Sequence, residues 1–109
     1  MPAPLAPYTF RNGVVVPNRV ALAPLTNLQS HADGTLADVE QAWLARRAAG
    51  GFGVITTCAA YVAPDGKGWP GELGVERDDQ VPRLAELASA LRAGDDDGLL
   101  VGALLDHER

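Results

Sequence analysis

The sequence has one cysteine, few aromatic residues and no long apolar run. Because Cys58 has no partner for an internal disulfide, we expect a reducing, cytoplasmic environment. No apolar stretch approaches the roughly 20 residues that a membrane-spanning helix needs, so we expect no membrane partner. The amino terminus lacks a positive charge ahead of an apolar run, which argues against a secretory signal.

An excess of basic residues is absent as well. The 109 residues include 9 Lys and Arg against 14 Asp and Glu, which gives a net charge of −5. Nucleic-acid-binding proteins usually carry a basic patch, and we therefore expect no nucleic-acid partner. The composition is otherwise that of an ordinary globular protein, with 47% hydrophobic and 21% charged residues, and the length allows one domain at most.

Turn-forming residues divide the chain into short apolar blocks. Asn12 and Gly13 lie between two β-rich runs, which predicts a hairpin over residues 7–16. Three continuous apolar runs predict strands, and two segments with apolar residues at helical spacing predict helices. The expected strands are about 19–24, 52–57 and 98–105, and the expected helices are about 36–49 and 79–93. The apolar face of the first helix is expected to hold Leu36, Val39, Trp43 and Leu44.

The segments between these elements predict helix caps, a loop and a turn. Thr35, with Asp38 three residues later, is expected to cap the first helix, and Asp78 is expected to cap the second. The glycine-rich segment from 58 to about 77 is expected to be a long loop, and loops of that length are often functional. The acidic residues 95–97 are expected to form a solvated turn.

The order of the elements is hairpin, β, α, β, α, β. Such alternation predicts a parallel sheet with right-handed crossovers. Ligands of parallel α/β sheets bind at the carboxyl ends of the strands. Residues 24–27 and 57–60 lie at such ends in this chain. The residues alone therefore predict an α/β fold with a candidate site that is formed by these two segments.

A run of ten residues, Asn-Arg-Val-Ala-Leu-Ala-Pro-Leu-Thr-Asn at 18–27, opens a series of motifs. The further motifs lie at 33–35, 45–53, 54–57, 62–68, 71–75 and 79–81. Their order and spacing resemble the old yellow enzyme family, the FMN-dependent NADH:flavin oxidoreductases, over about residues 5–93. The resemblance implies that residues 1–109 are the N-terminal part of a TIM (β/α)₈ barrel, incomplete as a barrel.

The resemblance also implies FMN as cofactor, NAD(P)H as reductant and an activated alkene or similar small molecule as electron acceptor. Thr26 matches the family threonine that donates a hydrogen bond to the flavin carbonyl next to N5. Without the resemblance, Thr26 would be interpreted as a strand-end threonine that binds local backbone. Pro24 and Leu25 match backbone that lies against the flavin ring, and Ala59 matches a small residue near the same flavin edge.

Two positions depart from the family pattern. Cys58 stands where the family commonly has an acidic residue. Because nothing beside Cys58 indicates a depressed pKa, we interpret it as a buried small residue rather than a redox thiol. The family glutamine that binds the flavin pyrimidine falls on Leu104 or Gly102, depending on register, and neither residue has a side chain that forms hydrogen bonds.

A complete barrel of this type takes about 250 residues, more than twice the length of this chain. The family's substrate-anion-binding pair and its tyrosine proton donor fall beyond residue 109, so the catalytic residues are unknown, and we expect no metal site. We therefore expect the truncated N-terminal part of an FMN-dependent NAD(P)H oxidoreductase, inactive as an isolated chain. The alternative is a non-catalytic partial barrel, either a truncated product or a subunit that associates with itself or a partner chain through exposed sheet edges.

Overall fold

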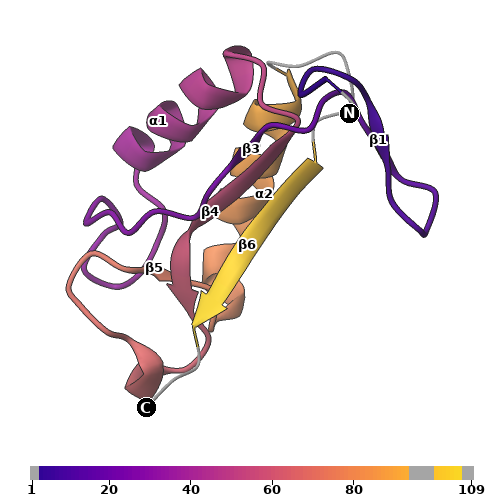
Figure 1. The fold of residues 1–109 in the computed structure, drawn as a ribbon. Helices are drawn as coiled ribbons and strands as arrows, with labels where there is room; N and C mark the ends of the chain where they lie inside the picture. Colours follow the sequence, from indigo (N-terminus) through magenta and orange to yellow (C-terminus); the bar gives the residue numbers. More distant parts are fainter. Residues whose placement is uncertain (1–2, 94–99, 107–109) are drawn as a thin grey trace.

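The computed structural model describes residues 3–93 and 100–106, which form a small parallel sheet, two helices and a hairpin (Figure 1). The strands are β1 Tyr8–Thr9, β2 Val15–Val16, β3 Ala21–Leu22, β4 Val54–Tyr61, β5 Leu73–Gly74 and β6 Leu100–Asp106. The α-helices are α1 Asp38–Ala49 and α2 Val81–Ala93, and short 3₁₀ turns lie at Pro64–Gly66 and Asp78–Gln80. The order along the chain is that of a hairpin followed by β-α-β-α-β, with β5 inserted after β4.

The hairpin lies where the Asn-Gly pair predicts it. β1 and β2 are antiparallel, with Tyr8 opposite Val16. Gly13 has a φ of 91°, a left-handed conformation that glycine adopts without strain. The backbone N–H of Val14 donates to the Asn12 side-chain oxygen at 3.1 Å, and the N–H of Phe10 donates to the Val14 carbonyl at 2.8 Å. These bonds close the turn.

β4 is the central strand of the four-stranded sheet. It pairs in parallel with β3, β5 and β6. β6 pairs with both ends of β4, from Val54 to Tyr61. β3 pairs only with the first residues of β4 and β5 only with its last, so these two short strands share the edge of β4 that faces away from β6. After Leu22 the chain therefore no longer pairs with β4, and β5 occupies the same edge of β4 at Ala60 and Tyr61.

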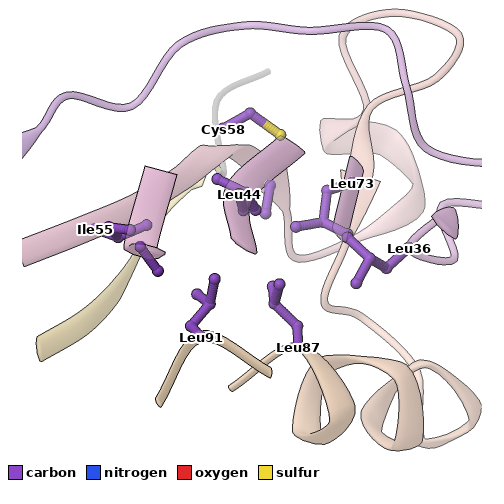
Figure 2. Packing of buried hydrophobic residues seen from close by; sticks show 9 residues of the cluster. Leu36, Leu44, Ile55, Cys58, Leu73, Leu87 and Leu91 are labelled. Atoms are coloured by element: carbon purple, nitrogen blue, oxygen red, sulfur yellow. The ribbon is translucent and has the colours of Figure 1, made fainter. Parts of the chain in front are cut away.

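Both helices pack against one face of this sheet, and the hydrophobic core lies between them (Figure 1). Figure 2 shows side chains from β4, β5 and both helices pointing toward one another. The buried cluster consists of Leu36, Leu44, Ala48, Ile55, Cys58, Ala60, Leu73, Leu87 and Leu91. Each of these residues is at most 3% exposed, so the core is closely packed although it is small.

The second strand of the parallel sheet is longer than the sequence predicts. The expected strand over 52–57 is β4, and it continues through Tyr61. Its last residues pair with both β5 and β6, and they were expected to belong to a long loop. The register between β4 and β6 shifts between Thr56 and Ala59. This extension depends on partners that are distant in sequence, and local turn residues do not reveal it.

Both helices begin differently from the sequence expectation. α1 begins at Asp38, and its N-cap residue, Ala37, provides no side-chain hydrogen bond. Thr35 does not cap it, because Thr35 lies two residues before the N-cap, in a turn where its N–H donates to the Asp33 carboxylate at 2.9 Å. Asp78 is not the cap of α2 either.

A 3₁₀ turn precedes α2, and its last residue is the buried Gln80. The Gln80 side-chain oxygen accepts from the N–H groups of Glu76 and Arg77 at 2.9 and 3.1 Å. This side chain therefore stabilises the start of α2 in place of Asp78. The turn expected at residues 95–97 lies outside the described residues.

The core predicts a large effect of truncation at Leu91, whose side chain is fully buried between α2 and the sheet. We expect Leu91→Ala to lower the free energy of unfolding by about 2–5 kcal/mol, because it removes apolar contacts and leaves a cavity. Val39→Ala is the control, since Val39 is 57% exposed, and we expect a change within about 0.5 kcal/mol. Urea unfolding followed by circular dichroism measures both, and equal effects would contradict the packing described here.

Candidate functional site

The residues expected to contact a cofactor lie on two neighbouring segments of the sheet. Pro24, Leu25 and Thr26 follow β3 in irregular backbone and are exposed. Ala59 lies in the carboxyl-terminal half of β4 and is half-buried. β3 and β4 are parallel neighbours, so both segments lie toward the same end of the sheet.

A buried carboxyl group joins these two segments. The side-chain amide of Asn27 donates to Oε2 of Glu40 at 3.5 Å, and the thiol of Cys58 donates to the same oxygen at 3.0 Å. Asn27 directly follows Thr26, and Cys58 directly precedes Ala59. Two donors that reach one oxygen are close to each other, so the structure brings the Thr26 and Ala59 segments together.

Glu40 is fully buried on α1, and its contacts are hydrogen bonds. The hydroxyl of Ser30 donates to its other oxygen, Oε1. Among the salt bridges of the described residues, none includes Glu40. The oxygens of a buried carboxyl group need hydrogen-bond donors in place of water. Three donors from separate positions meet this requirement.

Cys58 is a buried, unreactive thiol, as the sequence predicts. It is 3% exposed and belongs to the hydrophobic core. Burial, the hydrogen bond to Glu40 and the negative charge of Glu40 together raise the pKa of Cys58 to about 12, and burial is the largest of these causes. The thiolate is the reactive form of cysteine, so this site does not support a redox or nucleophilic role.

The register of the sheet gives the β4 neighbours of the two positions on which the family glutamine falls. Ala59 of β4 is opposite Leu104 of β6, whereas Gly102 is opposite Thr56. Leu104 is therefore the β6 residue that is level with the candidate flavin edge. A leucine has no hydrogen-bonding group in its side chain, so this position does not supply an amide to a cofactor.

Leu36 and Leu44 of the expected apolar face are in the core and Trp43 packs against it, but sequence reasoning placed Val39 on that face and missed Glu40. Val39 was expected on the apolar face and is 57% exposed. The buried residues of α1 are Glu40, Leu44 and Ala48, spaced by four. A glutamate at helical spacing from a leucine and an alanine was the available signal.

A hollow of about 330 Å³ lies between the hairpin and β3, and Val54, the first residue of β4, lines it. It is therefore at the opposite end of β4 from Ala59. Within residues 3–93 and 100–106, no cluster of three or more His, Cys, Asp or Glu side chains is placed to hold a metal ion. No helix in this part of the chain is long and apolar enough to cross a membrane.

The arrangement of strands and helices matches solved flavin oxidoreductases. The old yellow enzyme homologue from Zymomonas mobilis superposes with a TM-score of 0.85 at 28% identity, covering 97% of this chain and 28% of that chain. Morphinone reductase gives a TM-score of 0.84 at 25% identity and covers 97% of this chain and 26% of that chain. The fold is therefore the N-terminal part of a TIM barrel of the old yellow enzyme type, and the described residues form an open sheet.

Sequence comparison gives the same class. A probable NADH-dependent flavin oxidoreductase of Bacillus subtilis (strain 168) is 39% identical over 87 residues, which are 80% of this chain and 23% of that protein. The NADH:fumarate oxidoreductase of Klebsiella pneumoniae (strain 342) is 33% identical over 89 residues, which are 82% of this chain and 10% of that protein. The model of the NADH:flavin oxidoreductase / NADH oxidase family matches residues 5–101, and the chain belongs to this family.

The environment of Cys58 predicts that its thiol is alkylated slowly at neutral pH. A rise of its pKa from 9.0 to about 12 lowers the thiolate fraction about a thousandfold. We expect the folded chain to react with a thiol reagent such as iodoacetamide at least that much more slowly than the urea-unfolded chain. The raised folded-state pKa also means that Cys58 contributes stability below pH 9, and that this contribution is lost as the pH rises through about 12.

Cys58→Ser is the control for the pH effect, because serine keeps a donor for Glu40 and does not titrate in this range. The wild type should lose more stability than Cys58→Ser when urea unfolding is compared at pH 8 and pH 10. Rapid labelling of the folded wild type, or identical pH slopes for the two proteins, would contradict this description of the thiol.

Proposed function

We propose that the chain provides the first strands of an FMN-dependent NAD(P)H oxidoreductase of the old yellow enzyme type. Hydride would pass from NAD(P)H through FMN to an activated alkene or a similar small-molecule acceptor. Family membership supports the cofactor and the reductant. Because the chain spans about a quarter of the length of its Bacillus relative, the reaction of a whole enzyme is part of this proposal.

The observation that carries the proposal is the convergence of two segments at the carboxyl side of the sheet. Glu40 binds both Asn27 and Cys58, so the neighbouring Thr26 and Ala59 are held near each other. Parallel α/β sheets bind cofactors at this end. A site that is assembled from the ends of the first two barrel strands is consistent with one edge of a flavin.

The residue types at this place fit one edge of an isoalloxazine ring. Thr26 is exposed, and none of the hydrogen bonds among the described residues uses its hydroxyl, so it is free to donate. Ala59 has a side chain small enough for a ring edge to approach β4. Pro24 and Leu25 would offer backbone against the ring. Neither Leu104, which is opposite Ala59, nor Gly102 would supply the amide that the resemblance implies on the third strand.

When bound, FMN supplies the acceptance and release of hydride, and the residues of this chain supply position and charge stabilisation. Reduction places negative charge on the pyrimidine side of the flavin. The Thr26 hydroxyl would donate to that side, and such a donor favours the reduced ring. Ala59 would keep the ring edge free of collision. The proposal assigns no residue of this chain to catalysis on the electron acceptor.

The alternative function is a non-catalytic partial barrel that pairs with another chain or with itself. Among the described residues, β3 and β6 each pair only with β4, so each presents one unpaired edge. Unpaired edges favour association with further strands. We also propose a cytoplasmic location, because Cys58 is a free and buried thiol.

Cofactor binding distinguishes the two functions. We expect the purified full chain to bind FMN with a flavin absorbance spectrum and to oxidise NAD(P)H only where the rest of a barrel is supplied. Ala59→Leu should weaken FMN binding about 10- to 100-fold, because the larger side chain overlaps the ring edge. Ala42→Leu, on the exposed surface of α1, is the matched control and should bind as the wild type does.

Fluorescence titration with FMN and size-exclusion chromatography measure these properties together. Absence of FMN binding by the wild type, with formation of a colourless dimer, would favour the partial barrel and reject the flavoprotein proposal. Equal binding by Ala59→Leu and the wild type would reject the assignment of Ala59.

The proposed role of Thr26 predicts that its substitution changes the reduction potential of bound FMN. Thr26→Val keeps the shape of the side chain and removes the donor, so the reduced flavin should lose about 1.5–3 kcal/mol of stabilisation, or about 30–65 mV for a two-electron couple. We therefore expect a lower potential of bound FMN in a dye-equilibration measurement. Thr9→Val, in the exposed hairpin, should leave the potential unchanged. A potential that is equal in Thr26→Val and the wild type would remove Thr26 from the site.

A further inference from the structure

We propose that Glu40 is the positioning residue of this site: its buried carboxyl group fixes the segment that carries Thr26 against the strand that carries Ala59. The consequence for flavin chemistry rests on the function proposed above, whereas the consequence for the fold does not. Glu40 lies on α1, outside the four residues expected to contact the cofactor. It would act through its hydrogen-bonding partners rather than by contact with FMN.

Three donors from two separate parts of the chain meet on Glu40. Asn27 and Ser30, from the irregular segment between β3 and α1, donate to Oε2 and Oε1 respectively. Cys58, from β4, donates to Oε2 at 3.0 Å. The partners are 10, 13 and 18 residues from Glu40 in sequence, so the carboxyl group joins elements that the local backbone does not.

Apolar packing does little to hold the segment that carries Thr26. Leu25 and Leu28 are 54% and 68% exposed, and residues 23–29 form neither helix nor strand. β3 itself ends at Leu22, so the ladder with β4 does not reach Thr26. Polar contacts must therefore fix this segment, and Glu40 binds it at both Asn27 and Ser30.

Glu40 binds β4 from the face that lies away from the candidate flavin edge. Cys58 points into the core beneath the helices, with Leu44 and Leu87 in the same cluster. Successive side chains of a strand point to opposite faces, and Ala59, which directly follows Cys58, is only half-buried. One carboxyl group can thus set the position of Ala59 without occupying the space in front of it.

Burial of a carboxyl group in a hydrophobic core is energetically unfavourable. Removing a carboxylate from water is unfavourable, and an apolar side chain of similar size packs at less expense in free energy. A carboxyl group with two acceptor oxygens can bind the hydroxyl, the amide and the thiol together. The geometry is therefore that of a group that specifies position, at a cost in stability.

Glu40→Gln is the sharpest test, because glutamine has the same shape but replaces one acceptor oxygen by a donor. In the full chain without FMN, we expect amide hydrogen exchange at Gln29 and Ser30 and in residues 57–60 to quicken about tenfold or more relative to the rest of the sheet, since the N–H groups of Gln29 and Ser30 are hydrogen-bonded. Cys58→Ala removes one donor only and should give a smaller change in the same two segments. This milder variant keeps the test valid if Glu40→Gln does not fold.

Two controls separate positioning from general destabilisation. Leu91→Ala weakens the core without touching this hydrogen-bond group, so it should quicken exchange across the sheet rather than in the two segments. Glu86→Gln removes a carboxylate from the exposed surface of α2 and should change neither segment. With FMN bound, Glu40→Gln should shift the flavin potential in the same direction as Thr26→Val, whereas neither control should shift it.

The outcomes separate this proposal from the proposed function. Localised exchange in Glu40→Gln supports the positioning role even if the wild type binds no FMN, in which case only the flavoprotein assignment fails. If exchange in Glu40→Gln quickens uniformly over the sheet, as expected for Leu91→Ala, the positioning role is overturned whether or not FMN binds. If the wild type binds FMN and Glu40→Gln leaves its potential unchanged, the role of Glu40 in the flavin site is rejected.

Discussion

The parallel pairing of β4 is the constraint on which the rest of the structure depends. One edge of β4 pairs with β6 at both ends of the strand, and its other edge is shared by β3 and β5. One face of β4 carries the core residues that both helices cover. Removal of β4 would leave each remaining strand of this sheet without a partner, so its eight residues organise both the fold and the candidate site.

The irregularity in β4 is the point where fold and site meet. The register with β6 shifts between Thr56 and Ala59, and on the far side of that shift Ala59 is opposite Leu104. Bulges change the direction of side chains and are common beside functional sites. Here the shift lies next to Cys58, which faces Glu40, so the strand is held from behind at the place where its regular pairing is interrupted.

Much of the fold could be predicted from local signals, whereas the support of the site could not. Asn12-Gly13 indicates the hairpin because its turn chemistry is local, and the apolar runs indicate a parallel sheet. The extension of β4 to Tyr61 depends on β5 and β6, which are distant in sequence. Thr26 and Ala59 are candidates only through resemblance to a family, and Glu40 was missed because Val39 was placed on the buried face instead.

The two faces of the sheet therefore have separate physical tasks. The helix-covered face provides stability through apolar burial, and Glu40 is the polar exception within it. A buried carboxyl group opposes stability, and its three donors offset that penalty only while the Asn27 segment and β4 keep their relative positions. Displacement of either segment would leave a buried oxygen without its donor, which is unfavourable. The same energetic penalty that weakens the core thus makes the arrangement of Thr26 and Ala59 specific.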